Sequence, residues 1–285
     1  MSDYQRWVDA VVTRTGPFEV VRERPWSLVV KVPTARGDHW FKENRAGTIY
    51  EAALIEALPR WAPGRVLEPL AVDAARGWSL LPDGGPILRS VEGVAWEPFL
   101  AAYAQLQRDL APRAGEMVAL GVPDLRLLDG RGLDGWLAAL PIPDAVAGYL
   151  PTLRELGKEL AHSPIAPSIQ HDDLHDANIF AGGQIFDWGD SSVGHPFGTL
   201  LVTLRVARHV GRDADRLRDA YLEPWTDLAP RVQLLREAEV AQQLAKVGRA
   251  LSWQRAIIGA SAEDLAEYEE SITGWLEELL ADSPD

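Results

Sequence analysis

The stretch SIQHDDLHDANIF at residues 168–180 is followed, after a Gly182-Gly183 turn, by QIFDWGD at residues 184–190. In both segments apolar residues flank polar ones, as when a polar loop lies between short buried strands. Aspartates and one asparagine are concentrated there, and negative charge near a core costs free energy unless a cation balances it. Mg²⁺ is the natural candidate, because it prefers carboxylate and amide oxygens and keeps substrate phosphates and water as further ligands.

The spacing of these residues resembles a known pair of motifs. His171-x-Asp173-x-x-x-x-Asn178 followed by Asp187-Trp188-Gly189 resembles the catalytic and metal loops of aminoglycoside phosphotransferases and related antibiotic and metabolite kinases. It is also similar to the His-Arg-Asp…Asn and Asp-Phe-Gly elements of protein kinases. The resemblance implies that Asp173 accepts or orients the proton of the substrate hydroxyl, while Asn178 and Asp187 hold the Mg²⁺ that bridges the ATP phosphates. A coincidental acidic surface loop is the alternative, which the order and spacing of both segments disfavour.

The first eighty residues allow an independent check. A kinase-like lobe needs a lysine on its third strand that contacts the nucleotide phosphates, and a glutamate on the next helix that pairs with it. Lys42 ends the third predicted strand, at residues 39–42. On the following helix Glu51 shares a face with apolar residues and is expected to point inward, whereas Glu56 lies roughly 140° further round and is expected to face water. Lys42 and Glu51 are therefore the predicted pair, although either alone is more typical of a solvated surface.

Two departures narrow this prediction, one from the protein-kinase pattern and one from the antibiotic-kinase family. No GxGxxG lies between the first two strands, where Arg24-Pro25-Trp26-Ser27 stands instead, and this favours the antibiotic-kinase family. Ser27 is a candidate phosphate contact, with an ordinary turn serine as the equal alternative. Asp172 stands where the family commonly has glycine. The resemblance further implies that the backbone of residues 78–81 binds adenine.

The order of the predicted elements gives the fold class. Strands are expected near residues 18–22, 28–32, 39–42, 66–72 and 78–81, with one helix beginning near Tyr50. After Pro82–Pro86 the sequence becomes helical, with helices near 96–110, 151–161, 200–210 and 232–258 and a last helix opened by the capping pair Ser261 and Asp264. We predict an α+β, bilobal, protein-kinase-like fold. Residues 1–82 form the nucleotide-binding lobe with a small antiparallel sheet, and residues 83–285 the larger helical lobe with the catalytic loop, metal loop and acceptor site.

Composition and charge exclude several classes of protein. The 42 acidic against 28 basic residues give a formal net charge of −14, which repels a phosphate backbone, so no nucleic-acid partner is expected. No run of about 18 uncharged apolar residues occurs, and the first ten residues lack a signal-peptide core, so we expect no membrane span and a cytoplasmic location. The absence of cysteine excludes disulfides and thiolate chemistry.

These observations predict an ATP- and Mg²⁺-dependent kinase that phosphorylates a hydroxyl of a small molecule. The acidic surroundings suit an aminoglycoside, an amino sugar or another cationic metabolite, and the choice among them stays open, as do the oligomeric state and the roles of Asp172, His175, Asp190 and Trp253. Protein phosphorylation is the weaker enzyme alternative, because residues 191–196 run almost directly into helix and leave little room for a peptide-binding segment. A nucleotide-binding, pseudokinase-like module is the alternative from another class. It is disfavoured because the expected lysine, glutamate, asparagine and both aspartates are all present.

Overall fold

The computed structural model describes residues 1–127 and 132–281, and it confirms the predicted α+β class. The chain forms two compact units. The first contains residues 1–91, 177–189 and 255–264, and the second contains residues 92–176, 190–254 and 265–285. The lobe boundary predicted at Pro82–Pro86 stays a prediction. In the described part of the chain, no helix combines the length and hydropathy that a membrane-spanning segment requires.

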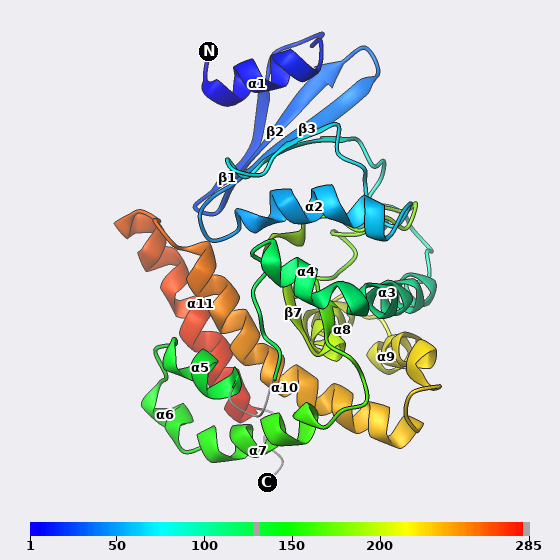
Figure 1. The fold of residues 1–285 in the computed structure, drawn as a ribbon, viewed down its shortest axis with the longest axis vertical. Coiled ribbons are helices and arrows are strands. Elements are labelled where there is room, and N and C mark those ends of the chain that lie inside the picture. The colour runs from blue at the N-terminus through cyan, green and yellow to red at the C-terminus, as the bar shows by residue number, and fades with distance from the viewer. Residues whose placement is uncertain (128–131, 282–285) are drawn as a thin grey trace. The chain divides into compact units, whose positions relative to one another are not determined.

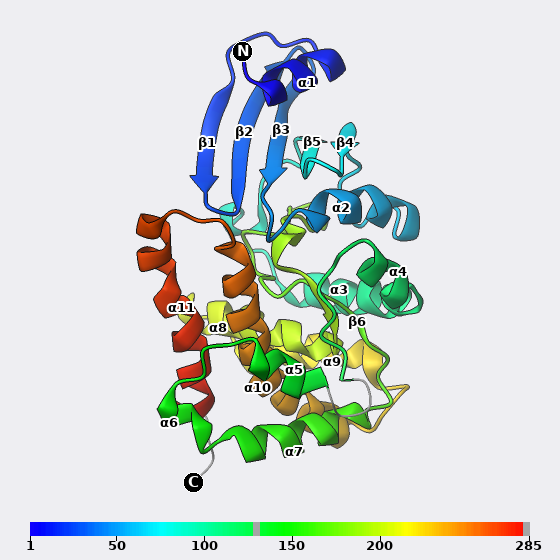
Figure 2. The same cartoon turned by 60° about the vertical axis from the view of Figure 1, so that its left-hand side comes forward.

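A five-stranded antiparallel sheet in the order β1-β2-β3-β5-β4 dominates the first unit (Figure 1). The strands are β1 (Glu19–Arg24), β2 (Ser27–Thr34), β3 (Gly37–Asn44), β4 (Ala71–Asp73) and β5 (Trp78–Pro82). The strands β1, β2, β3 and β5 lie where the sequence predicts strands, because short runs rich in valine and aromatic residues are separated by turn residues. The strand predicted at residues 66–72 is formed only at its end, where β4 begins. Figure 2 shows β1, β2 and β3 side by side, with β5 and β4 continuing the sheet.

The two faces of this sheet are covered differently. Val30 of β2 pairs with Phe41 of β3, and Phe41 pairs with Leu80 of β5, so these buried residues share one face. The helix α1 (Asp3–Val11) contributes Val8 to the same core, and Tyr4 stacks on Phe41 with ring centroids 4.9 Å apart. The opposite face carries every second residue of the same strands, and Lys42 lies on it.

The helix α1 lies outside the predicted elements, although its start carries a recognisable signal. The Ser2 hydroxyl accepts a hydrogen bond from the Gln5 backbone N–H, and the Gln5 side chain accepts one from the Ser2 N–H. This reciprocal capping box satisfies two otherwise free donors at the beginning of the helix.

The helix α2 (Tyr50–Trp61) confirms the predicted inward and outward faces. Glu51 is 2% exposed, whereas Glu56 is exposed to solvent. The helix continues two residues past Pro59 and ends at Trp61. The first unit also contains the hairpin of residues 179–185, in which Ile179 pairs with Ile185.

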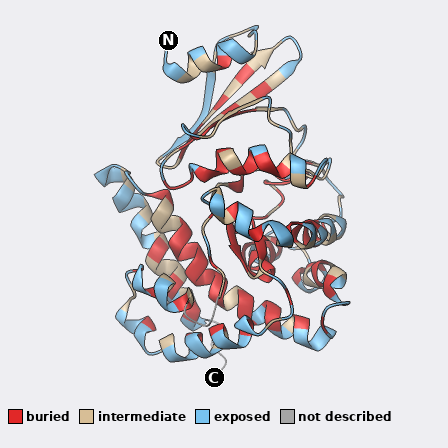
Figure 3. Cartoon of the chain, viewed as in Figure 1, coloured by how far each residue is buried: buried red, intermediate tan, exposed pale blue. Residues whose placement is uncertain are grey.

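The second unit is mainly helical, as predicted, and its buried residues line the inner faces of its helices (Figure 3). The structure corrects two points. The sequence analysis places no helix between residues 110 and 151, but the described part of this stretch contains the short α-helices α4, α5 and α6. The helix α9 also lies outside the predicted helices. The described helices are α3 (Glu97–Leu110), α4 (Ala114–Ala119), α5 (Gly132–Ala138), α6 (Asp144–Ala147), α7 (Leu150–Ala161), α8 (Leu200–His209), α9 (Ala214–Leu222), α10 (Arg231–Ala256) and α11 (Ala262–Ala281).

A two-stranded ladder of β6 (Ser168–Gln170) and β7 (Ser192–Gly194) flanks the acidic stretch, as its apolar borders predict. Helix α3 anchors β6 through the buried Gln107. The Gln107 amide donates to the carbonyl of Ile169 at 2.7 Å, and the Ser168 hydroxyl donates to the Gln107 carbonyl at 2.5 Å. Four residues earlier on the same face, the Tyr103 hydroxyl accepts the His171 backbone N–H at 2.9 Å. Helix α3 therefore fixes the start of the predicted catalytic loop.

Candidate active site

The first unit contains a cavity of about 470 Å³ on the face of the sheet opposite α1. The sheet lines it with Val21, Arg22, Val29, Trp40, Lys42 and Leu81, and the hairpin that follows the predicted catalytic loop lines it with Phe180, Phe186 and Asp187. Phe180 and Phe186 stack with ring centroids 4.3 Å apart. The cavity is thus mostly apolar and aromatic, with charged groups gathered in one part, which is typical of a site for a flat aromatic ligand that carries charge.

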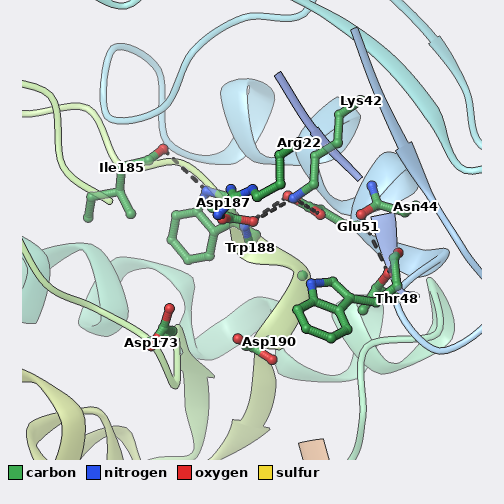
Figure 4. Close-up of polar contacts among 12 residues, drawn as sticks. Arg22, Lys42, Asn44, Thr48, Glu51, Asp173, Ile185, Asp187, Trp188 and Asp190 are labelled. Atoms are coloured by element: carbon green, nitrogen blue, oxygen red, sulfur yellow. Dashed lines mark hydrogen bonds and ion pairs between the residues drawn. The ribbon is translucent and has the colours of Figure 1, made fainter. Parts of the chain in front are cut away.

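Lys42, Glu51 and Asp187 come together in this cavity (Figure 4). The Lys42 Nζ lies 2.6 Å from Glu51 Oε2 and 2.5 Å from Asp187 Oδ1. The other Glu51 oxygen accepts the Trp188 backbone N–H at 2.9 Å. Burial disfavours the ammonium, but the charges of Asp187 and Glu51 outweigh it and raise the pKa of Lys42 above its ordinary value. Lys42 therefore stays a cation that is held by two carboxylates from different parts of the sequence.

The hairpin also brings the backbone of Asn178 opposite the metal-loop residues. The Phe186 N–H donates to the Asn178 carbonyl at 3.1 Å, and the Phe180 N–H donates to the Gln184 carbonyl at 2.9 Å. Asn178 therefore lies opposite Phe186 in the hairpin, and Asp187 is the residue that follows Phe186. Asp187 has a φ of 61°, a left-handed conformation that aspartate and asparagine adopt more readily than other side-chain-bearing residues.

The donor set fits a magnesium ion. Among the described residues, no group of three or more histidine or acidic side chains is arranged to hold a metal. The Asp187 carboxylate and the Asn178 amide offer two oxygen donors. Mg²⁺ commonly binds only one or two protein ligands when phosphates and water complete its coordination. These two residues do not suit a metal ion whose ligands all come from the protein.

In the second unit the predicted base, Asp173, lies in a polar network. His175 Nε2 is 3.5 Å from Asp173 Oδ2, and the Asp173 side chain is 32% exposed. Burial raises the pKa of Asp173, but the hydrogen bond from His175 and the positive charge of Arg249 outweigh it and hold that pKa below its ordinary value. Asp173 is thus ionised at neutral pH, as an acceptor for a hydroxyl proton must be.

Asp190 and Trp253 have partners within the same unit. Asp190 Oδ1 accepts the Ser252 hydroxyl at 2.6 Å, and Asp190 Oδ2 lies 3.4 Å from Arg249 Nη1. Trp253 stacks on Tyr268 with ring centroids 5.7 Å apart. Asp190, which follows the predicted metal loop in sequence, is therefore bound to Ser252 and Arg249 of α10.

Ser27, the remaining predicted contact, is buried at the start of β2, opposite Arg24 and Asn44. Among the described residues that line the cavity, Ser27 does not occur. Two residues that do line it, Arg22 and Trp40, were not singled out from the sequence. Trp40 precedes Lys42 by two positions, so strand alternation already places both on one face. Arg249 was missed because nothing in the sequence relates α10 to the catalytic loop.

Asp172 has a backbone conformation that glycine adopts more readily than most other residues. Its φ is 61°, it is 5% exposed, and its Oδ2 accepts the Ser192 hydroxyl at 2.5 Å. Glycine adopts this left-handed conformation without steric cost, and aspartate is one of the few alternatives. Here the carboxylate adds a hydrogen bond that ties the loop to β7.

Two variants of Asp172 separate the effect of the left-handed backbone from that of the hydrogen bond to Ser192. Asp172→Ala is expected to lower the free energy of unfolding by about 1–3 kcal/mol, because it keeps the left-handed strain and loses the bond to Ser192. Asp172→Gly loses the same bond without the strain, so it is expected to be more stable than Asp172→Ala by about 1 kcal/mol. Urea denaturation measures both. Equal stability of the two variants would mean that backbone conformation does not select the residue here.

Comparison with known proteins gives the fold a name. No protein-family model matches the sequence, and no curated protein matches it. Solved structures match nearly the whole chain. A choline/ethanolamine kinase family protein from Mesorhizobium loti has a TM-score of 0.60 at 18% identity over 99% of this chain and 95% of its own. Choline kinase LicA from Streptococcus pneumoniae has a TM-score of 0.59 at 13% identity over 96% and 97%.

A third match is the spectinomycin phosphotransferase APH(9)-Ia, solved with ADP and spectinomycin, with a TM-score of 0.54 at 10% identity over 98% of this chain and 94% of its own. The chain has the fold of these small-molecule kinases. The resemblance inferred from residues 171–189 is confirmed at the level of the fold. Because fold alone does not determine function, the activity has to be argued from the side chains of the site.

Proposed function

We propose that the protein is an ATP-dependent O-phosphotransferase that acts on a hydroxyl group of a small molecule. The observation that carries the proposal is the Lys42–Glu51–Asp187 cluster in the cavity of the first unit, at 2.6 and 2.5 Å. A buried lysine held by two carboxylates costs desolvation free energy, which a structural role does not require. In a phosphotransferase the same lysine binds phosphate, and the glutamate fixes its position.

The other residues take roles that their surroundings support. Trp40, Phe180 and Phe186 offer aromatic surface for a nucleobase, and Asp187 presents a carboxylate that is one-third exposed. Asn178 and Asp187 would hold Mg²⁺, which neutralises phosphate charge when bound. Asp173, ionised and held by His175, would accept or orient the proton of the acceptor hydroxyl. Asp173 precedes Asn178 by five residues, so one loop of the sequence supplies both functions.

The acceptor is proposed to be small, hydroxylated and cationic. The formal net charge of −14 and the aspartates of the loop favour a cation over an anion. Among structures with this fold, one binds spectinomycin, another binds hygromycin B, and two are named for choline or ethanolamine kinases. Aminoglycosides, amino sugars and amino alcohols are therefore the classes to test first.

The experiment is a measurement of ADP release with Mg-ATP against a panel of aminoglycosides, macrolides, amino sugars and amino alcohols, with mass analysis of any phosphorylated product. At least one hydroxyl compound is expected to stimulate ADP release. Chelation of Mg²⁺ with EDTA is expected to abolish the stimulation, and added Mg²⁺ to restore it, because the cation that would neutralise the phosphate charge is removed and then returned. Tight Mg-ATP binding with no stimulation by any compound would support a nucleotide-binding module instead.

A further inference from the structure

We propose that Arg22 binds the phosphates of the nucleotide and supplies hydrogen-bond donors where a glycine-rich loop would otherwise supply backbone amides. This inference rests on the proposed function, since it assigns a further residue of the same nucleotide site. The β1–β2 turn of this chain contains no glycine, and Pro25 within it has no N–H to donate. The turn therefore offers a phosphate fewer backbone donors than a glycine-rich loop does.

The sheet register directs Arg22 toward the cavity. Arg22 of β1 pairs with Val29 of β2, and Val29 pairs with Lys42 of β3, so the three side chains form one row on one face. The register shifts between Val20 and Arg22, which is the position of a β-bulge. Such a bulge re-aims side chains, and accordingly the neighbours Val21 and Arg22 both line the cavity although strict alternation would separate them.

The two cations of this row share one carboxylate. Lys42 Nζ lies 2.5 Å from Asp187 Oδ1, and Arg22 Nη2 lies 3.8 Å from Asp187 Oδ2 (Figure 4). The Arg22 side chain is 55% exposed, in contrast to 14% for Lys42. Arg22 is thus held loosely at the charged part of the cavity and retains the freedom to move onto a bound phosphate.

Charge balance gives a reason for a second cation. Glu51 and Asp187 have a combined formal charge of −2, so Lys42 alone would leave the cluster at a formal charge of −1 before an anionic nucleotide arrives. Arg22 brings the cluster to zero. A guanidinium is suited to this task because its planar fork binds phosphate oxygens in pairs. An exposed pair with Asp187 alone would contribute little to stability, so a purely structural role explains the position of Arg22 poorly.

Calorimetric titration of the full chain with Mg-ATP, Mg-ADP and adenosine tests the proposal. Arg22→Ala is expected to weaken Mg-ATP binding by about 10–100-fold, the loss typical of a charge-assisted hydrogen bond. Adenosine binding should be unchanged, since adenosine has no phosphate. Arg22→Lys should recover part of the loss because it keeps the charge. The matched control is Arg24→Ala on the same strand, because Arg24 is exposed and does not line the cavity.

The outcomes separate this inference from the proposed function. Equal Mg-ATP affinity of Arg22→Ala and the wild type would overturn the role of Arg22 and leave the proposed function standing. Equal loss of adenosine and Mg-ATP affinity would also overturn it, because the side chain would then shape the cavity rather than bind phosphate. A wild-type chain that binds no Mg-ATP would refute the proposed function itself.

Discussion

Replacement of Asp173 by asparagine is expected to lower turnover by about 10²–10⁴-fold, the usual contribution of a general base, while Mg-ATP affinity stays near that of the wild type. Asparagine preserves the shape of the side chain and its contact with His175 but cannot accept a proton from the acceptor hydroxyl. The side chain is one-third exposed, so the substitution should not unfold the second unit. The effect should therefore fall on the chemical step.

The measurement compares kcat and KM for ATP in the stimulated ADP-release assay, with the affinity for Mg-ATP measured separately by calorimetry. Asp134→Asn serves as the control, because Asp134 is an exposed acid of the same unit that is ion-paired with Arg154 at 2.7 Å. Turnover of Asp173→Asn at the wild-type rate would remove Asp173 from the mechanism. A parallel loss of Mg-ATP affinity would point to a role in nucleotide binding instead.

Replacement of Asp187 by asparagine is the second change with a large expected effect. We expect Mg-ATP affinity to fall by more than about 100-fold, because even outer-sphere changes at metal sites cost 10–100-fold. Asparagine is chosen over alanine because it tolerates the left-handed backbone at φ 61°, so the metal loop should keep its conformation. Lys42 keeps its contact with Glu51 at 2.6 Å, which protects the first unit from an unpaired buried charge.

Titrations with Mg-ATP and with adenosine, each at several Mg²⁺ concentrations, measure this prediction. Adenosine affinity is expected to persist, since the aromatic part of the cavity is untouched, while the Mg²⁺ dependence of ATP binding should weaken. Glu56→Gln is a suitable control, because Glu56 is an exposed acid on the same helix as Glu51. Normal Mg-ATP affinity in Asp187→Asn would contradict the assignment of Asp187 as a metal ligand.

Local patterns explain why much of the fold was predictable. The strands β1, β2, β3 and β5 follow valine-rich or aromatic runs bounded by turn residues, and the helical period of α2 alone separates the buried Glu51 from the exposed Glu56. The capping pair Ser261 and Asp264 opens α11 as predicted, with the Asp264 N–H donating to the Ser261 hydroxyl at 3.1 Å. Each of these patterns extends over only a few neighbouring residues, so it can be recognised from the sequence alone.

Short elements escaped prediction because their stability comes from distant partners. Packing of its apolar residues on the sheet stabilises helix α1, and this packing includes a stack of Tyr4 on Phe41. Helices α5 and α6 are too short to be stable alone. The cavity-lining position of Arg22 depends on a register shift between two strands, which no local pattern reveals. The influence of Arg249 on Asp173 links residues 76 positions apart.

The acidic stretch at residues 168–190 was enough to indicate the kinase-like fold and the aspartates and asparagine that the proposed chemistry needs. Their order and spacing are properties of one continuous segment, and phosphoryl transfer constrains them directly. The contacts of the charged groups became visible only in the folded chain. Lys42 lies between Glu51 and Asp187, and Arg22 lies in the same row as Lys42. Asp173 lies beside His175 and is influenced by the charge of Arg249. Electrostatic interactions depend on distance in space and on burial, and both arise only once separate strands and helices have packed.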